Sequence, residues 1–345
     1  MFCADTDVEL KTEELKPHSL KSNEVMVETH VLSCDAFIRT ILDEEAYHGV
    51  VEIDGTLPAI GYGKVIAAGP EANLKVGTMV SGMMGAQTHT VIQANQAFRM
   101  TTFPFMSPTS SLGLMGLTSG LTAYVGLFYV CKRPRKGETV VVTGAAGAVG
   151  SIAAQLAKST KARVIGVAGG EKKCNFLKDE LGLDGAIDYK NKQASLEEQL
   201  AINCPNGIDY IYDNVGGSIL DSLLDKINPK GRVVICGAIS QYSGNLNKGK
   251  VQGPSNYLKL AERGAEMKGF NVMQYMWRIP MALFGMFFMY MRNQVKMTEH
   301  IEDGISSFPN ALHKMFNGGH IGKMLVDVNG SLKNEKNPVI QKKQD

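Results

Sequence analysis

The sequence lacks an excess of charge of either sign and lacks closely paired cysteines. Its 345 residues include 36 Lys and Arg against 34 Asp and Glu, so the formal net charge is only +2. A chain this close to neutral carries no broad polyanion-binding signal, and nucleic acid is not expected as a partner. The six cysteines are scattered along the chain, which argues against a disulfide framework and for a reducing compartment. We therefore expect a cytoplasmic protein.

A long hydrophobic run is also absent. The longest apolar stretch extends from Ile279 to Met291 and is shorter than the ~20 residues that a membrane-spanning helix needs. Residues 1–21 are polar and show no charged-then-apolar targeting signal. We expect a soluble protein without a membrane span, in which the Met- and Phe-rich stretch is a helix of the core or of a subunit contact.

The catalytic motifs of several enzyme classes are missing. The sequence has no His-Glu-x-x-His, no Gly-x-Ser-x-Gly and no Cys-x-x-Cys. Cys34 follows a predicted strand, where it could be a zinc ligand, but a zinc site needs three or four ligands. No His-Glu pair accompanies it in Ile60–Lys64. We expect no metal site, and Cys34 is expected to be a small buried residue.

A strand, a glycine turn and a helix follow one another in the middle of the chain. The β-branched run Val140–Thr143 is typical of a fully buried strand, and a helical pattern of small residues ends near Lys158. The spacing Gly-x-Gly-x-x-Gly between them falls on Ala145, Gly147 and Gly150, with alanine in the first place. Strand, turn and helix together open a βαβ unit that holds a dinucleotide pyrophosphate at the helix N-terminus. A plain structural turn is the alternative, but the context on both sides favours cofactor binding.

Hydrophobic periodicity divides the chain into regions. Residues 1–117 contain short alternating strands broken by glycine turns, which predict a β-barrel-like domain with strands near 24–32, 63–69 and 77–82. In residues 118–292 strands alternate with helices, which predicts an α/β domain with a doubly wound parallel sheet. Its strands are expected at 140–143, 163–168, 186–188, 208–212 and 231–236.

The last part of the chain is expected to return to the first domain. Residues 293–328 contain a predicted helix near 308–316 and a predicted strand at 323–328. The segment 329–345 is rich in Lys, Asn and Gln, and it is predicted to be a disordered tail.

The end of the second strand of the α/β domain indicates which dinucleotide binds. An NAD site places an acidic side chain there for the ribose 2′-hydroxyl, but this chain has Val167–Gly170 without a carboxylate. Glu171, Lys172 and Lys173 follow at the start of the next helix. Because a 2′-phosphate adds negative charge, the Gly-Gly corner beside lysines favours NADPH over NADH. The alternative is that both lysines simply form a solvated helix face.

Several motifs in a fixed order resemble a known family. They are Gly120-Leu-Thr-Ala-Tyr124, Ala145-Ala-Gly-Ala-Val-Gly150, Asp213-Asn-Val-Gly-Gly217, Cys236-Gly-Ala-Ile-Ser-x-Tyr242, Gly269-Phe-x-Val272 and Ile321-Gly-Lys323. The chain resembles the medium-chain dehydrogenase/reductases over nearly its whole length, and within them the zinc-independent branch. That branch holds prostaglandin reductases (leukotriene B4 12-hydroxydehydrogenases), 2-alkenal double-bond reductases and curcumin reductases. The resemblance implies a Rossmann domain inserted into a GroES-like β-barrel domain.

The same resemblance implies a set of NADP(H)-binding residues. Gly147, Ala148, Val149 and Gly150 are expected at the pyrophosphate and Lys173 at the 2′-phosphate. Tyr189 is expected at the adenosine, and Asn214 at the point where the strand order reverses. The remaining residues implied are Cys236, Gly237, Ala238, Ile239, Ser240, Tyr242, Phe270, Asn271, Val272 and His320.

Two positions depart from the family pattern. Where the family usually has Asp-Pro-Tyr-Met-Arg, this chain has Asp35-Ala-Phe-Ile-Arg39, so Phe37 replaces a substrate-facing tyrosine. Where the family usually has an asparagine before Gly-Lys, this chain has His320. Imidazole can form hydrogen bonds where the amide did, but it can also titrate near neutral pH. Substrate range and proton delivery are the properties that these two changes affect.

The implied reaction is the NADPH-dependent reduction of the carbon–carbon double bond of α,β-unsaturated ketones or aldehydes, of the 15-oxoprostaglandin 13-reductase or 2-alkenal reductase type. Metal-free hydride transfer to the β-carbon leaves negative charge on the carbonyl oxygen, which needs preorganised donors. Tyr242 is the first candidate donor and Tyr257 the second, and a structural role for each hydroxyl is the alternative. An apolar cleft between the domains is expected to hold the enone.

Two other functions remain open from the sequence. A quinone reductase of the same superfamily shares the fold and the cofactor, and a non-catalytic NADPH-binding protein can be built on the same frame. The resemblance also implies a homodimer that pairs through the strand near Lys268–Val272. The physiological substrate does not follow from the sequence.

Overall fold

The computed structural model describes residues 4, 6–14, 20–42, 49–100, 103, 105–242, 251 and 253–334. Internal contacts divide the chain into two units. Unit 1 comprises Met1–Leu112, Glu299–His320 and Met324–Asp345, and unit 2 comprises Gly113–Thr298 and Ile321–Lys323. Unit 2 is therefore inserted into the sequence of unit 1, as the sequence predicted.

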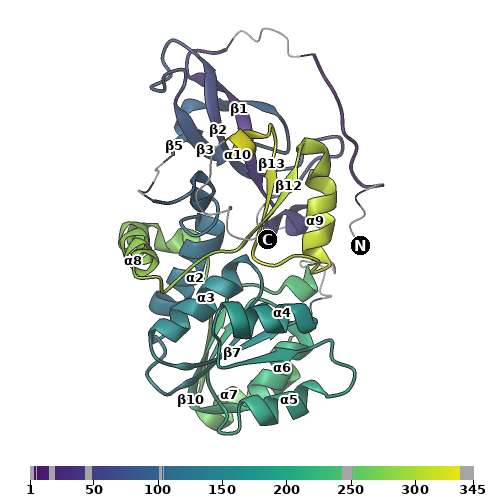
Figure 1. The fold of residues 1–345 in the computed structure, drawn as a ribbon, viewed down its shortest axis with the longest axis vertical. Helices are drawn as coiled ribbons and strands as arrows, with labels where there is room; N and C mark the ends of the chain where they lie inside the picture. The colour runs from purple at the N-terminus through teal and green to yellow at the C-terminus, as the bar shows by residue number, and fades with distance from the viewer. Residues whose placement is uncertain are drawn as a thin grey trace. The chain divides into compact units, whose positions relative to one another are not determined.

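The described residues of unit 1 are built around a seven-stranded sheet. Its strands are β1 (Glu24–Ser33), β2 (Ile60–Ala68), β3 (Met79–Met83), β4 (His89–Gln93), β5 (Phe98–Arg99), β12 (Glu299–Asp303) and β13 (Lys323–Asp327). The order is β12-β13-β1-β2-β3-β5, and β4 also pairs with β1. Strand β1 is antiparallel to β2, β4 and β13, and Figure 1 shows β13, in yellow, beside β1. The three strands predicted before residue 100 are confirmed, with shifted ends.

The core of unit 1 lies between this sheet and two helices, α1 (Phe37–Ile41) and α9 (Phe308–Phe316). Phe308 and Leu312 of α9 are buried in the same cluster as Cys34, whose exposed fraction is 2%. Cys34 is thus a small buried residue, as predicted. Phe37 packs against this cluster and is half-buried.

The prediction of a disordered tail is wrong for residues 331–334. Ser331–Asn334 form the short helix α10. Its first turn is held by Asn329, whose Oδ1 accepts the Ser331 N–H, and by Asp327, whose Oδ2 accepts the Leu332 N–H. Leu332 is buried in a second apolar cluster of unit 1. Residues 335–345 of the predicted tail lie outside the described residues.

Unit 2 contains a six-stranded sheet in its described part, in the order β11-β10-β9-β6-β7-β8. Its strands are β6 (Thr139–Thr143), β7 (Arg163–Ala168), β8 (Gly185–Asp188), β9 (Ile208–Asp213), β10 (Ile227–Ile235) and β11 (Glu266–Gly269). The recorded pairs are all parallel. Starting from the far edge, the third, second, first, fourth, fifth and sixth strands follow one another, which is the doubly wound dinucleotide-binding order. The predicted fold class is confirmed.

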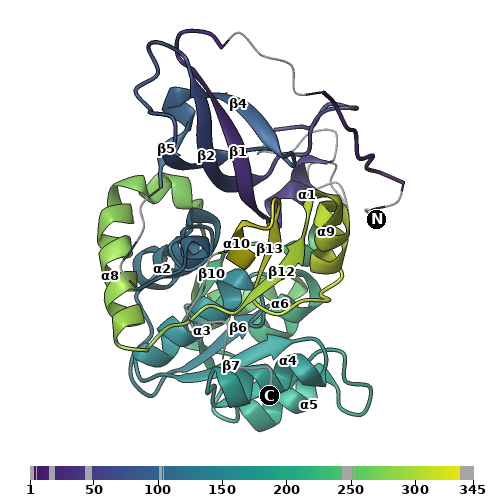
Figure 2. The same cartoon turned by 45° about the horizontal axis from the view of Figure 1, so that its top comes forward.

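The helices of unit 2 connect these strands. They are α2 (Thr122–Val125), α3 (Ala148–Ser159), α4 (Glu171–Asn175), α5 (Leu196–Asn203), α6 (Gly217–Asp225), α7 (Leu258–Arg263) and α8 (Ile279–Met291). Helix α3 packs on β6 and β7 (Figure 2), whereas α6 packs on β9 and α7 on β10. Helix α2 lies between two π-helical turns, Leu117–Leu121 and Gly126–Val130. The single helix predicted after β7 ends at Asn175 and continues as a π-helical turn, Phe176–Glu180.

Helix α8 has the bounds that the apolar run predicted, but only one of its faces belongs to a core. Ile279, Ala282 and Met286 are buried, whereas Phe284 and Phe288 are 61% and 43% exposed. The interpretation of this run as a core helix therefore explains only its buried side. In the part of the chain that the structure describes, every helix is too short or too polar to cross a bilayer.

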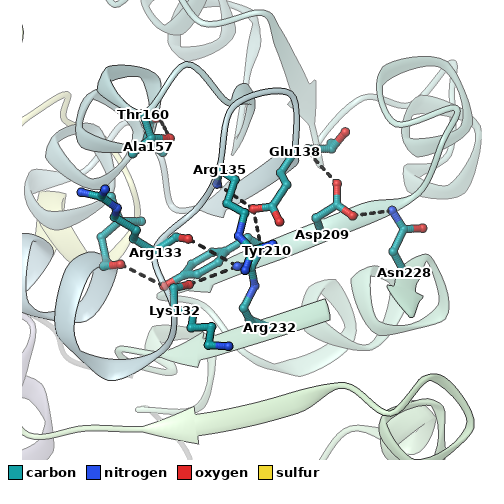
Figure 3. A network of polar contacts seen from close by, with 12 residues as sticks. Lys132, Arg133, Arg135, Glu138, Ala157, Thr160, Asp209, Tyr210, Asn228 and Arg232 are labelled. Carbon is teal, nitrogen blue, oxygen red and sulfur yellow. Dashed lines mark hydrogen bonds and ion pairs between the residues drawn. The ribbon is translucent and has the colours of Figure 1, made fainter. Parts of the chain in front are cut away.

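A buried ion pair holds the loop that leads into β6 (Figure 3). Arg232 of β10 donates from Nη2 to Oε2 of Glu138 at 2.5 Å, and from Nη1 to the carbonyl oxygens of Lys132 and Arg133. The same carboxylate oxygen accepts the N–H of Arg135 at 2.7 Å. Because a buried arginine is costly without partners, these bonds fix the path of residues 132–138 against the sheet.

Candidate functional site

The predicted site residues of unit 2 lie at one edge of its sheet. All strands run parallel, so the loops that follow them meet at the carboxyl edge, where doubly wound sheets bind ligands. The predicted residues follow successive strands: 147–150 after β6, Lys173 after β7, Tyr189 after β8, Asn214 after β9, 236–242 after β10 and 270–272 after β11. The fold thus gathers segments that are more than a hundred residues apart in the sequence.

The turn between β6 and α3 depends on three glycines. Gly144 has φ of +59°, a left-handed conformation that glycine adopts without strain. A Cβ at Gly150 would lie 2.2 Å from the carbonyl oxygen of Gly144, so this position needs glycine for the helix to approach the strand end. A Cβ at Gly147 would meet only that same oxygen, at 3.3 Å. Gly147 therefore leaves space on the side of the turn that a ligand can approach.

The N-terminus of α3 provides donors for an anion. Gly147 is the N-cap residue, and no side chain of the described residues caps the helix there. The first N–H groups of a helix have no partner within the helix, and the helix dipole adds positive potential. Ala148, Val149 and Gly150 carry these groups. The turn accordingly fits a dinucleotide pyrophosphate.

The corner after β7 holds two lysines close together. Burial lowers the pKa of Lys173, and the charge of Lys190 lowers it further by a smaller amount. Among the described residues neither ammonium group has a carboxylate within ion-pair distance. Two cations held near each other without an acidic partner fit a ligand phosphate. Sequence reasoning identified Lys173 but missed Lys190, which follows β8 and comes near only in the folded sheet.

The two glycines of this corner serve different purposes. A Cβ at Gly169 would lie 2.7 Å from the ring of Tyr189, so that ring packs directly over the strand end. Gly170 has φ of +94° and open space around it, and its N–H donates to Oδ1 of Asp188 at 2.7 Å. Tyr189 is 46% exposed, and the Lys190 ammonium lies over its ring, 5.9 Å from the ring centre.

Asn214 lies at the point where the strand order reverses, between β6 and β9. Its Nδ2 donates to the carbonyl oxygen of Thr143 at 2.7 Å, and its N–H donates to Oγ1 of the same residue at 2.8 Å. Asp213 is fully buried and accepts the Thr143 hydroxyl at 2.7 Å and the Gly216 N–H at 2.9 Å. Burial raises the pKa of Asp213, and the hydrogen bonds oppose that change.

Asp213 and Thr143 are positioning residues that sequence reasoning missed. They join the ends of two strands 70 positions apart and hold the loop that carries Asn214. The signal that could have found them is an acidic residue at the end of a largely buried strand, because such a carboxyl group needs partners.

The loop after β10 folds back over the end of β9. The N–H of Ile239 donates to the carbonyl oxygen of Asn214, and the Ser240 hydroxyl donates to that of Val215 at 2.6 Å. The Tyr242 hydroxyl accepts the N–H of Ala238 at 3.3 Å and lies against Gly237, where a Cβ would come within 2.9 Å. The loop 236–242 is therefore ordered onto the same edge as Asn214.

Cys236 starts this loop and is half-buried. Burial raises the pKa of Cys236 to about 12, with a smaller opposing effect from its hydrogen bond with Tyr212. The thiolate is the nucleophilic form of cysteine, and a raised pKa disfavours that form.

The segment after β11 is anchored by its aromatic residue. A Cβ at Gly126 would lie 2.8 Å from the ring of Phe270, so this ring packs on the π-helical turn that contains Gly126. The Asn271 side chain accepts the N–H of Met273 at 3.0 Å and caps the turn Val272–Arg278. Asn271 thus acts within its own chain segment, while Phe270 and Val272 are half-buried.

Tyr257 and His320 are the other two predicted residues. Tyr257 is 57% exposed and lies on the turn Ser255–Tyr257, which is held to α6 by two bonds between Asn256 and Asp221. His320 belongs to unit 1, whereas the next residues, Ile321–Lys323, belong to unit 2. The Gly322 N–H donates to the carbonyl oxygen of Ala146 at 2.8 Å, which joins this segment to the glycine turn.

Metal ligands do not gather in the part of the chain that the structure describes. No group of three or more His, Cys, Asp or Glu side chains is placed there to hold an ion. The polar groups at the carboxyl edge of the sheet are instead hydrogen-bond donors that can bind anions and hydroxyl groups.

Known proteins match both units. Residues 2–100 match the family described as the N-terminal domain of oxidoreductase, and residues 148–284 match the family described as zinc-binding dehydrogenase. The 2-alkenal reductase (NADP(+)-dependent) of Nicotiana tabacum is 34% identical, covering 94% of this chain and 93% of the relative. Prostaglandin reductase 1 of Mus musculus is 34% identical, covering 94% of this chain and 95% of the relative.

A solved structure agrees with these relatives. The crystal structure of CurA from Vibrio vulnificus in complex with NADPH superposes with a TM-score of 0.83 at 32% identity, covering 93% of each chain. The sheet order, the glycine turn and these matches define a dinucleotide-dependent oxidoreductase. The chain belongs to the medium-chain dehydrogenase/reductase family, in the branch of NADP-dependent 2-alkenal and prostaglandin reductases.

Proposed function

We propose that this protein reduces the carbon–carbon double bond of α,β-unsaturated ketones or aldehydes with NADPH. The observation that carries the proposal is the 34% identity to a 2-alkenal reductase over 94% of the chain. It is supported by the anion-binding turn at Gly147 and by the cation pair Lys173 and Lys190. NADP(H) is the cofactor whose pyrophosphate and 2′-phosphate these two features fit.

The bound cofactor supplies a hydride for the β-carbon of the substrate. The chain's own residues bind and orient: the N–H groups of 148–150 hold the pyrophosphate, Lys173 the 2′-phosphate, and the Tyr189 ring covers the adenosine side. Asn214 and the loop 236–242 border the nicotinamide end of the edge, together with Phe270 and Val272. Holding both reactants in one geometry supplies much of the rate in such a reaction.

Hydride addition leaves negative charge on the carbonyl oxygen of the substrate. A hydroxyl donor aimed at that oxygen stabilises the enolate as it forms. We assign this role to Tyr242, because its loop is tied to Asn214 at the same edge. Tyr257 is the weaker candidate, since its turn is held to the middle of α6.

The function is tested by following NADPH oxidation with enones and alkenals of graded chain length, and with a small quinone. We expect turnover with the enones, a saturated ketone or aldehyde as product, and deuterium from C4-labelled NADPH at the β-carbon. Dialysis against a chelator is expected to leave the rate unchanged. Turnover of the quinone alone would make the protein a quinone reductase, and tight NADPH binding without any turnover would make it a non-catalytic binding protein.

Replacing Tyr242 with phenylalanine separates its two possible roles. If the hydroxyl stabilises the enolate, kcat with an enone falls roughly 10-fold or more while the KM for NADPH changes little. Steady-state kinetics with both substrates varied measures this split. A raised KM for NADPH at unchanged kcat would instead assign Tyr242 to cofactor binding, and Tyr257→Phe serves as the comparison.

The homodimer expected from the family resemblance belongs to this proposal as well. Strand β11 is the last strand of the sheet in unit 2 and pairs with β10. An edge strand offers unpaired backbone groups to a second copy, so two β11 strands could join the sheets of two protomers.

A further inference from the structure

Helix α8 carries an exposed apolar face. Met281, Phe284, Phe288 and Met291 are spaced three, four and three residues apart, which places them along one side of the helix. Met281 and Phe284 are both 61% exposed, and the buried side of the helix is formed by Ile279, Ala282 and Met286. We call the four exposed residues the α8 face.

The apolar surface continues on the turn that precedes α8. Met273, Met276 and Trp277 are all exposed, Trp277 to 68%. Single exposed apolar residues are common, but a continuous group of this kind marks a contact with a protein or a membrane. Tryptophan is enriched at membrane–water interfaces because its ring is apolar and its N–H is polar.

A groove lined by cations runs beside α8. Its volume is about 710 Å³, and Met289 of α8 forms part of its wall together with the rings of Tyr124, Phe128 and Tyr129. The charged residues that line it are all basic: Arg133, Arg135, Lys136 and Lys161. The groove lies by the starts of β6 and β7, at the opposite end of these strands from the glycine turn.

Two more cations border α8 on the side of this groove. Arg278 directly precedes the helix, eleven residues before Met289, and Arg292 directly follows it, three residues after Met289. At these spacings the three side chains lie along one side of the helix. The Arg278 guanidinium stacks on Trp277 at 3.9 Å and lies 5.2 Å from the Tyr129 ring. The α8 face is thus bordered along one side by positive charge.

The basic loop of the groove is held in place by the ion pair of Figure 3. Arg232 binds the carbonyl oxygens of residues 132 and 133, and Glu138 accepts the N–H of Arg135. The carboxylate of Glu138 is already paired with Arg232. It therefore fixes the loop without neutralising the cations that line the groove.

We propose that the α8 face docks on an anionic lipid membrane, with its Met and Phe side chains in the interfacial layer and the bordering cations at lipid phosphates. A helix with an apolar face, a tryptophan and a basic border is the combination that lies in a membrane surface without crossing it. In a symmetric contact, a second copy of the chain would bring the same cations against those of the first. The groove lies at the opposite end of the strands from the edge proposed to bind NADPH, and the proposal stands independently of the reaction.

Trp277 reports on this contact directly, because it is the only tryptophan of the chain. Its fluorescence is measured while phosphatidylcholine vesicles, with or without phosphatidylserine, are added to the full-length protein. We expect a blue shift and co-sedimentation with the anionic vesicles, at least 10-fold weaker with the neutral ones. Binding is expected to weaken strongly in 1 M salt, where the screening length is only ~3 Å.

Phe284→Glu with Phe288→Glu tests the face itself. We expect this double variant to lose vesicle binding at least 10-fold and to keep NADPH oxidation, which also reports that it is folded. Ile202→Glu is the matched control, because Ile202 is 75% exposed on α5 of the same unit. Absence of vesicle binding by the wild-type protein would overturn the proposal, as would equal binding by the double variant. A change in oligomeric state without any vesicle binding would assign the face to a second copy instead.

Discussion

Replacing Lys173 with alanine is expected to raise the KM for NADPH by roughly 10- to 100-fold, since a hydrogen bond to a charged group contributes about 1.5–3 kcal/mol. The KM for NADH is expected to change less than about threefold, because NADH has no 2′-phosphate for this side chain to bind. Steady-state kinetics with each cofactor at a saturating enone concentration measures both values.

The structure gives this prediction its physical basis. Lys173 is half-buried, and burial and the neighbouring Lys190 both lower its pKa. In the absence of an anion, its charged form is therefore less stable at this site than it would be in water. A bound phosphate removes this disadvantage by pairing with both ammonium groups. We therefore expect the site to discriminate between the two cofactors by the positive charge that it already holds.

The neighbouring lysine provides a matched control. Lys172 is exposed and lies on the same short helix, so Lys172→Ala is expected to change either KM less than about twofold, as for most exposed charges. Equal increases for NADPH and NADH in Lys173→Ala would contradict a role at the 2′-phosphate. They would indicate that the lysine supports the fold of the corner instead.

Replacing Gly150 with alanine is expected to abolish most NADPH binding, with an affinity loss of roughly 100-fold or more. A methyl group there would lie 2.2 Å from the carbonyl oxygen of Gly144 and 2.9 Å from the Cα of Ala145. Both contacts are with backbone, so helix α3 must shift away from β6 to relieve them. Overpacking of this kind typically costs about 1–3 kcal/mol in stability, and the shift also misaligns the N–H groups that face the pyrophosphate.

Isothermal titration with NADPH measures the expected loss of affinity, and a chemical unfolding curve measures the expected loss of stability. Gly253→Ala is the matched control, because a Cβ at Gly253 meets nothing within 4 Å. Its NADPH affinity and unfolding midpoint are expected to equal those of the wild-type protein. Wild-type NADPH affinity in Gly150→Ala would show that the turn does not bind the pyrophosphate.

Local sequence patterns were sufficient to predict the elements that carry the cofactor edge. The run Val140–Thr143 and the segment Arg163–Ala168 form buried strands at nearly the predicted residues. Apart from the exposed Arg163, their residues are β-branched or small, and such segments form strands wherever a sheet can bury them. Glycine at 144 likewise follows from covalent geometry, since few other residues adopt its φ of +59°, whereas glycine at 150 follows from the close approach of the helix to the strand end.

The same patterns could not predict contacts between distant segments. The pairing of Asp213 with Thr143, the approach of Lys190 to Lys173 and the buried Arg232–Glu138 pair each depend on which strands become neighbours. A sequence pattern reports the preference of one segment, whereas these interactions are properties of the assembled sheet. The position of the turn Ser255–Tyr257 against α6 is of the same kind.

Helix α8 shows both what the sequence predicted and what only the tertiary structure decided. The apolar run 279–291 was enough to predict a short helix, because apolar unbranched residues favour helix and the run is too short to span a membrane. A run that is apolar on every side does not indicate which side will pack. Only the tertiary structure decides that Ile279, Ala282 and Met286 face the interior while Phe284 and Phe288 remain exposed, because burial depends on the neighbouring elements.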